Sequence, residues 1–217
     1  ITITADARSK IMGEADPEFT WQITSGSIVN GDTPTGTLTR EAGESVGSYA
    51  IHQGTLTYGN NYAETYVGAN LTIGKATQSI AFGSLEERTY GDAPFELTAT
   101  ASSGLAVSFT SSNTSVATVS GNTVTIHSAG TTTITAIQTG NEDYNAAIPV
   151  EQVLNVNKAA LTVTAQNKSK TYDGDAFSPF TVAYIGFVNG DDHTNLGGTL
   201  SFAGSAVGAV NTGSYVI

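Results

Sequence analysis

The strongest constraint on the fold is an internal repeat with a period of about 80 residues. The motif KIMGEADPEFT begins at Lys10, RTYGDAPFELT begins at Arg88 and KTYDGDAFSPFT begins at Lys170. Each copy has a basic residue, a bulky residue two places later, a turn of glycine and acidic residues, and then an alternating apolar run. Because a repeat of this length can form its own small core, we expect three modules in series rather than one large domain.

The ends of the modules match as well, and this match places their boundaries. GNNYAETYVGANLTIGKA closes the first module at Ala76, and GNEDYNAAIPVEQVLNVNKA closes the second at Ala159. We therefore expect domains at residues 1–76, 77–159 and 160–217. Since almost no linker separates them, we expect the modules to stack end to end as a rod.

The third module is shorter than the first. Aligning AGSAVGAVNTGSYVI with REAGESVGSYAI places Ile217 opposite Ile51, so the counterpart of residues 52–76 is missing. We expect the native protein to continue past Ile217, because an open sheet edge recruits partners. Without its two closing strands, the third module is expected to be locally unstable, dimerised through its edge, or held by another chain. The apolar residues that then lack cover are Phe180, Val182 and Tyr184.

Apolar and polar residues alternate within a module, as in Val124–Ile126 and Ile134–Ala136. A period of two predicts strands with one buried face. Turn signals such as Asn30-Gly31 and Asn189-Gly190 recur roughly every eight to twelve residues. About seven short strands in each module predict an all-β protein built from tandem antiparallel β-sandwiches in an elongated array.

The charge balance and the absence of cysteine limit the possible partners. Asp and Glu number 19 against 8 Lys and Arg, which gives a net charge of -11. Such a surface repels phosphate and anionic lipid, so we expect no nucleic-acid partner. No apolar run is long enough to cross a bilayer, so we expect no membrane insertion. A Gly-rich, acidic chain without Cys is typical of exported bacterial surface proteins.

The first and third modules resemble the MBG repeats, a mostly β and glycine-rich family. The turn Tyr172-Asp173-Gly174, within LTVTAQNKSKTYDGDAFSPFTV, resembles the YDG type of that family, whereas the first module has Met12-Gly13-Glu14 at this place. The middle module resembles the bacterial Ig-like group 2 domain. Its matching residues are SSNTSVATVSGNTVTIHSAGTTTITA, from Ser111 to Ala136, and the later NEDYNAA.

These resemblances imply Ig-like β-sandwiches repeated along a large, secreted bacterial surface adhesin. The repeats of such proteins form a stalk between the cell and a distal binding domain, and the families carry no catalytic residues. MBG repeats are also common in proteins exported by type IX secretion, which implies the extracellular surface of a gliding or biofilm-forming bacterium. The implied partners are neighbouring repeats of the same chain and the secretion or surface-anchoring machinery.

Two functions are therefore open. The first is a structural spacer that projects a distal domain for cell adhesion. The alternative is that one module itself binds glycan or protein through its loops, as the end loops of sandwiches often do.

The acidic turns are the one serious ligand candidate. Ca²⁺ takes six to eight oxygen ligands, which carboxylates in loops can supply. The weak calcium candidates are Asp173, Asp175, Asp191, Asp192, Glu142 and Asp143. However, no Asp-x-Asp-x-Asp-Gly loop is present, and Asp and Gly favour tight turns for conformational reasons alone. We therefore expect these residues to shape turns, and the protein to need no cofactor.

Other reactive residue types lack a pattern that indicates chemistry. The three histidines, His52, His127 and His193, are far apart in the sequence, so we expect no zinc site. Because a repeated module rarely contains a unique active site, we also expect no enzyme. We interpret Trp21, beside Phe19, as core rather than a sugar platform. Covalent Lys–Asn cross-links occur in some surface stalks, and the candidate lysines are Lys10, Lys75, Lys158, Lys168 and Lys170.

Overall fold

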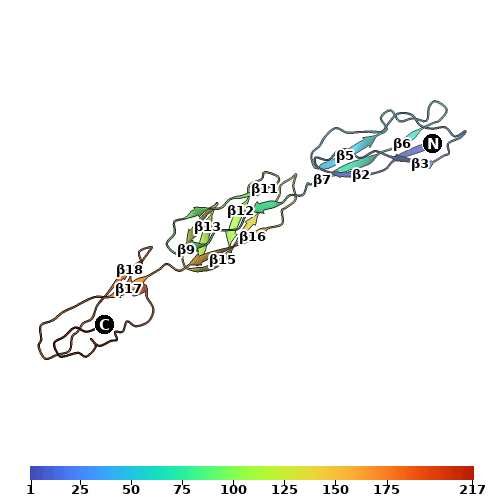
Figure 1. The fold of residues 1–217 in the computed structure, drawn as a ribbon. Helices are drawn as coiled ribbons and strands as arrows, with labels where there is room; N and C mark the ends of the chain where they lie inside the picture. The colour runs from blue at the N-terminus through green and yellow to red at the C-terminus, as the bar shows by residue number, and fades with distance from the viewer. The chain divides into compact units, whose positions relative to one another are not determined.

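A computed structural model describes residues 1–217, and its regular structure consists almost entirely of β-strands (Figure 1). The one helical segment is a 3₁₀ turn at His193–Asn195. None of the chain's helical structure is long or apolar enough to cross a membrane. The all-β fold that the alternating pattern predicts is confirmed.

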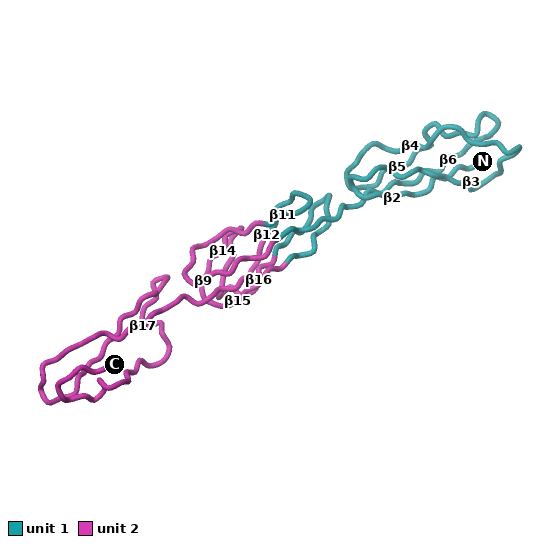
Figure 2. Tube along the Cα trace, in the orientation of Figure 1, with its two compact units in different colours: residues 1–82, 99–108, 136–150 teal, residues 83–98, 109–135, 151–217 magenta.

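The chain divides into two compact units (Figure 2). The first consists of residues 1–82, 99–108 and 136–150, and the second of residues 83–98, 109–135 and 151–217. This division passes through the middle of the second sequence repeat. The three boundaries expected from the sequence therefore stay a prediction.

Residues 1–74 form a β-sandwich whose two sheets share one apolar core. The first sheet has the order β3-β1-β6, with β1 at Thr2–Ala5, β3 at Trp21–Ser25 and β6 at Thr65–Val67. The second has the order β2-β7-β5-β4, with β2 at Arg8–Ile11, β4 at Thr39–Arg40, β5 at Gly47–His52 and β7 at Ala69–Gly74.

Strand alternation accounts for this core. Leu71 and Ile73 of β7 are buried, whereas Asn70 and Thr72, which alternate with them, are exposed. Successive side chains of a strand point to opposite faces, so one face of β7 supplies the core and the other faces water. Each such Leu or Ile side chain contributes about 1.5–3 kcal/mol by leaving water.

Three strand pairs are parallel, which differs from the purely antiparallel sandwich expected from the sequence. β1 pairs with β6, β2 pairs with β7, and β16 pairs with β9 in parallel registers. In the first sandwich, for example, Arg8 lies opposite Leu71 and Lys10 opposite Ile73. Alternation in the sequence reports that a strand is half-buried but not which neighbour it pairs with, so direction was decided only in the fold.

Residues 80–157 hold nine further strands in three sheets, ordered β11-β8, β10-β14-β13 and β12-β15-β16-β9. Their bounds are β8 Ile80–Phe82, β9 Arg88–Thr89, β10 Phe95–Glu96, β11 Ala99–Ala101, β12 Ser108–Ser111, β13 Ala117–Ser120, β14 Thr123–Ile126, β15 Gly130–Ile137 and β16 Val150–Asn157. The long strands β15 and β16 each supply fully buried residues, among them Ile134 and Leu154.

Residues 160–217 contain much less regular structure. β17 (Thr162–Ala165) and β18 (Val182–Ile185) form an antiparallel pair, and Ala206 is the one buried residue of this segment. Phe180, Val182 and Tyr184, which we expected to lack cover, are half-buried. The apolar residues of this segment therefore enclose no core comparable to that of residues 1–74.

The contrast between the two segments can be tested at equivalent positions of β1 and β17. Ile3 is 0% exposed and Val163 is 48% exposed. We expect Ile3→Ala to destabilise the first sandwich by about 2–5 kcal/mol, because it leaves a cavity in a closed core. Trp21 is the sole tryptophan and packs against this core, so urea unfolding followed by its fluorescence reports on the first sandwich.

The matched variant Val163→Ala should leave the tryptophan transition unchanged. It should also leave hydrogen exchange of residues 162–165 within about twofold of that in the parent chain, because an exposed side chain loses little burial. If Ile3→Ala and Val163→Ala lowered the urea midpoint reported by Trp21 fluorescence by the same amount, this account of the cores would be wrong.

Candidate functional site

The acidic turn of the repeat motif is built in the same way in two copies. In the first, the Glu14 backbone N–H donates to the Ile11 carbonyl at 3.0 Å, and the Ile11 N–H donates to Glu14 Oε2 at 2.9 Å. In the second, the Asp92 N–H donates to the Thr89 carbonyl at 2.9 Å, and the Thr89 N–H donates to Asp92 Oδ2 at 2.8 Å. The carboxylate therefore closes its own turn.

The glycine of this turn has a conformational role. Gly13 has a φ of 87° and Gly91 a φ of 102°, values that side chains with a Cβ rarely adopt. A glycine followed by an acidic residue thus meets two needs at once, a left-handed backbone and an acceptor for an otherwise free N–H. The motif that identifies the repeat is explained by local backbone requirements.

The third copy has an extra residue in the turn, and its carboxylate has different partners. Asp173 Oδ1 accepts from Lys170 Nζ at 2.6 Å and from the Asp175 N–H at 3.0 Å. These hydrogen bonds, that from Lys170 first, hold the pKa of the Asp173 carboxyl below its usual range. Asp173 and Asp175 are both exposed.

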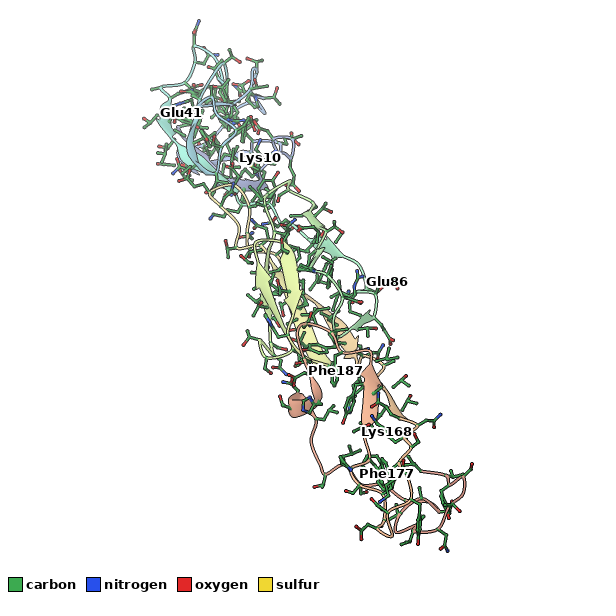
Figure 3. All side chains as sticks on the ribbon, turned by 90° about the vertical axis from the view of Figure 1, so that its left-hand side faces the viewer. Lys10, Glu41, Glu86, Lys168, Phe177 and Phe187 are labelled. Carbon is green, nitrogen blue, oxygen red and sulfur yellow. The ribbon has the colours of Figure 1, made fainter.

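A network of four charged side chains lies beside the turn of the first copy. Lys10 of β2, labelled in Figure 3, is only 7% exposed. Its Nζ lies 2.7 Å from Asp16 Oδ1 and 2.5 Å from Glu44 Oε2, and it donates to the Glu14 carbonyl at 3.0 Å. Arg40 Nε lies 2.6 Å from Asp16 Oδ2, and the same guanidinium also pairs with Glu44. The network connects β2, β4 and the loops that carry the two carboxylates.

The charges in this network stabilise one another. The hydrogen bond from Arg40, followed by that from Lys10, lowers the pKa of Asp16 to about 2. Hydrogen bonds to Asp16 and Glu44 raise the pKa of Lys10. Forming an amide cross-link requires a neutral amine, whereas this site holds Lys10 as the ammonium and Asp16 as the carboxylate. The arrangement fits a non-covalent ionic cluster.

The other candidate lysines have different surroundings. Lys75 Nζ donates to the backbone carbonyl of Asn141 at 2.6 Å, and Lys170 pairs with Asp173. Lys158 and Lys168 are exposed.

The six calcium candidates lie in three separate loops. Glu142 is exposed in the loop after β15, where the Asp143 carbonyl accepts from the Ala76 N–H at 2.9 Å. Asp191 Oδ2 accepts from the Tyr90 hydroxyl at 3.0 Å. Asp192 caps the 3₁₀ turn, since its Oδ1 accepts from the N–H and the hydroxyl of Thr194 at 2.8 and 2.6 Å. These bonds from Thr194 lower the pKa of Asp192.

No group of three or more His, Asp or Glu side chains in residues 1–217 is arranged to hold a metal ion. The loops offer at most neighbouring pairs of carboxylates, and Asp173 and Asp192 already accept hydrogen bonds from nearby backbone N–H groups. Each loop therefore supplies fewer carboxylate oxygens than the six to eight ligands that Ca²⁺ takes.

The remaining candidates are also separate from one another. His127 Nε2 lies 2.8 Å from the Thr118 hydroxyl on the neighbouring strand, and the His193 ring stacks on Tyr184 with 6.2 Å between the ring centroids. His52 ends β5 and is exposed. Trp21 and Phe19 pack against the core of the first sandwich, in agreement with the interpretation from the sequence.

The ionic network predicts an acid-sensitive first sandwich. The pKa of Asp16 is depressed in the folded state, so its stabilisation is present above about pH 4, the usual carboxyl value, and is lost as pH falls towards 2. We expect the urea midpoint reported by Trp21 fluorescence to fall over this range. Asp16→Asn should weaken this pH dependence of the urea midpoint. Glu18→Gln, which removes a nearby carboxylate outside the network, should leave it unchanged. If the two variants showed the same pH dependence, the assignment of the effect to Asp16 would be wrong.

From the acidic loops we predict that calcium does not change the thermal stability of the protein. A ligand that binds only the folded state raises the unfolding temperature, so a structural cation would reveal itself on chelation. We expect EDTA and added CaCl₂ to leave the thermal transitions unchanged. A drop of several degrees with EDTA, reversed by Ca²⁺ and abolished by Asp173→Ala or Asp191→Ala, would show that the acidic loops hold cations.

Of the comparisons with known proteins, the match to a family model agrees with the repeated structure. None of the curated proteins compared with the chain matches it. A solved structure of Sidekick-1 immunoglobulin domains 1–5 is 12% identical with a TM-score of 0.30, and the match covers 82% of this chain but only 46% of that one. The family model for the MBG domain matches residues 1–72 and 161–217, and it is the YGX type rather than the YDG type that Tyr172-Asp173-Gly174 led us to expect. Because the two matches span more than half of the sequence, the chain belongs to the MBG domain family.

Proposed function

We propose that this protein is the structural spacer region of a bacterial cell-surface adhesin, in which serial β-sandwich repeats project a distal binding domain for attachment. One observation carries the proposal: the MBG family model matches the same chain twice, at residues 1–72 and 161–217. Repetition of a small module extends a protein without adding a new active site at each copy, which is what a spacer requires.

The use of the charged residues supports a mechanical role. The carboxylates of Glu14 and Asp92 accept from the backbone of their own turns, and Asp16 and Glu44 neutralise Lys10 and Arg40. Groups satisfied in this way are poor candidates for acid–base or nucleophilic work, which needs a poised group beside a substrate. We accordingly propose no catalytic role and no cofactor.

The segment around Ala76 supports limited hinge freedom between the first two repeats. Within the first compact unit, the Ala76 N–H donates to the Asp143 carbonyl and the Asn145 N–H donates to the Ala76 carbonyl, each at 2.9 Å. Lys75 adds its bond to the Asn141 carbonyl. A connection tied by backbone hydrogen bonds swings less freely than a Gly/Ser linker.

The cellular setting belongs to the same proposal. MBG and Ig-like domains are typical of extracellular surface proteins, so we place the protein outside a bacterial cell. The resemblance of the middle repeat to Ig-like group 2 domains fits an adhesin stalk. Export by type IX secretion, a link to gliding motility, and contact with neighbouring repeats and with anchoring machinery follow from the family resemblance.

A binding role for one module is the second candidate, and one observation favours it. Two aromatic side chains of residues 160–217 face solvent: Tyr172 is 62% exposed and Tyr215 is 41% exposed. Exposed aromatic residues are enriched where proteins bind other molecules. Glycan-array screening of the chain, with Tyr172→Ala as the control variant, distinguishes this role from that of a passive spacer.

The spacer proposal predicts an extended particle in solution. A compact globule of 217 residues has a radius of gyration of about 17 Å. Small-angle scattering should give a clearly larger value with a skewed distance distribution. Inserting eight Gly/Ser residues after Gly74 should broaden that distribution, because the hydrogen bonds of Lys75 and Ala76 to residues 141–145 then no longer restrain the first sandwich. A radius near 17 Å for the parent chain would contradict the proposal.

A further inference from the structure

Two turns from different repeats meet within the second compact unit. The Tyr90 hydroxyl of the second repeat donates to Asp191 Oδ2 of the third at 3.0 Å. Beside this bond, a Cβ placed on Gly91 would lie 2.8 Å from Cβ and Cγ2 of Val188. Carbon atoms pack at about 3.5–4.0 Å, so only a glycine lets the two turns approach this closely. The contact thus combines a hydrogen bond with a close approach that a larger residue would prevent.

The turn that carries Tyr90 is held by its own repeat. The Tyr90 N–H donates to the carbonyl of Asn157, the last residue of β16, at 2.8 Å. On either side of Tyr90 and Gly91, Thr89 and Asp92 close the turn with the two hydrogen bonds described above. Because the backbone around Tyr90 is fixed in this way, its hydroxyl has a defined position before it meets another repeat.

The turn that receives Tyr90 is equally well defined. The Asp191 N–H donates to the Val188 carbonyl at 3.0 Å, and Asn189 and Gly190 between them have φ values of 55° and 82°. Two successive positive φ values are those of a type I′ turn, which an Asn-Gly pair favours. The turn follows Phe187, which is labelled in Figure 3. Local hydrogen bonding and backbone preference therefore set its shape.

The first repeat contains the same turn, with the sequence Val-Asn-Gly-Asp from Val29. The Asp32 N–H donates to the Val29 carbonyl at 3.1 Å, and Asn30 has a φ of 58°. Asp32 Oδ2 accepts from the Tyr62 hydroxyl at 2.8 Å, so the carboxylate of this turn accepts from a tyrosine in both repeats. A carboxylate has lone pairs for about four hydrogen bonds, so it can serve a donor inside its own repeat and another outside it.

The segment that connects the two repeats is short and tightly packed. β16 ends at Asn157 and β17 begins at Thr162. Gly186, which directly follows β18, has a φ of 116°, and a Cβ placed on it would lie 2.2 Å from the Ala160 carbonyl oxygen. The connecting backbone therefore lies against the backbone of the third repeat. This second close approach restrains the same junction as the pair of turns.

Neither side of this contact is common to all three repeats. At the place of Tyr90 the first repeat has Met12, which offers no hydroxyl and packs against the core of its own sandwich. β11 pairs with β8 as β18 pairs with β17, and the turn after β11 runs from Ala101 to Gly104 and contains no carboxylate. The second repeat thus has the donor turn and lacks the acceptor turn, whereas the first has the acceptor turn and lacks the donor.

We propose that these two turns form a recognition interface between repeats, which determines the type of repeat that follows a given one. A Tyr-Gly turn supplies a hydroxyl donor beside a surface without a side chain, and its partner is a Val-Asn-Gly-Asp turn in the next repeat. A following repeat without the carboxylate would leave the hydroxyl unpaired, and a bulkier residue in place of Gly91 would keep the turns apart. The interface adds a specific contact to the proposed spacer but does not depend on the spacer role.

The test uses the full chain with one spin label in each of the two repeats. The sequence contains no Cys, so Thr125→Cys on β14 and Thr164→Cys on β17 introduce two unique labelling sites, both at exposed positions. Double electron–electron resonance then measures the distribution of distances between the labels. We expect one narrow peak in the otherwise unchanged chain, because the docked turns and the short connection restrain both repeats.

Two matched substitutions test the hydrogen bond. Tyr90→Phe removes only the donor hydroxyl and should increase the fraction of molecules outside the narrow peak by about two- to tenfold, the effect of losing one hydrogen bond. Tyr172→Phe removes the hydroxyl from the equivalent place in the third repeat, where the side chain is 62% exposed, and should leave the distribution unchanged.

Two further substitutions test the close approach. Gly91→Ala introduces the Cβ that would meet Val188 and should shift most molecules out of the narrow peak. Adding Val188→Ala removes both Cγ atoms that the new Cβ would meet, so the narrow peak should return. Backbone strain at position 91 would persist in the double variant, so recovery separates the contact between the turns from strain within one of them.

Three results would overturn the proposal: a broad distance distribution in the chain that carries only the labels, equal distributions for Tyr90→Phe and Tyr172→Phe, or no recovery when Val188→Ala is added to Gly91→Ala. A failure of the spacer proposal would appear in small-angle scattering as a compact particle. It would leave these distance distributions unchanged, because they report only on the contact between the second and third repeats.

Discussion

Strand β7 holds the first sandwich together because it is hydrogen-bonded along both edges while it buries Leu71 and Ile73. Its parallel partner, β2, lies near the start of the module, so the module closes only when its two ends meet. Pairing of residues so distant in sequence is slow relative to hairpin formation, because the loop entropy must be lost before the contact forms. The position of β7 therefore completes both the sheet and the core.

Residues 160–217 share local contacts with the first sandwich but have little buried apolar surface. The β17–β18 pair forms, and Tyr215 makes the same local hydrogen bond as Tyr49. Yet Val163 is half-exposed where Ile3 is buried. These local hydrogen bonds therefore form in both segments, whereas the buried core is found only in the first.

Several charged side chains of this acidic chain interact with groups in direct contact with them. The carboxylates of Glu14 and Asp92 accept from neighbouring backbone groups, and two of the chain's eight basic residues, Lys10 and Arg40, are used together to hold Asp16 and Glu44. Exposed ion pairs contribute little to stability, but a buried ammonium that loses its partners is strongly destabilising. The geometry around Lys10 is therefore a structural requirement of the module, and the proposed spacer role needs no further chemistry from it.

The all-β class, the repeat and the turn chemistry could be predicted from the sequence, because each depends on neighbouring residues. Alternation marks strands such as Thr123–Ile126, and a glycine followed by an acidic residue marks a turn that needs positive φ and a local acceptor. The repeat also identified the GSYVI segment as the counterpart of GSYAI. The motif lysine Lys10 was recognised, but its partner Glu44 and the neighbouring Arg40 lie some 30 residues further along the chain, and no spacing signal links them.

Strand partners and direction were decided only by the tertiary structure. Whether β7 pairs with β2 in parallel or with a hairpin neighbour depends on how both sheets enclose Leu71 and Ile73, and the two arrangements have the same alternating sequence pattern. For the same reason, the sequence identified Asp191 and Glu142 as acidic turn residues but did not predict their contacts. Their distances to Tyr90 or to other carboxylates follow from long-range packing, which brings together residues that no local pattern connects.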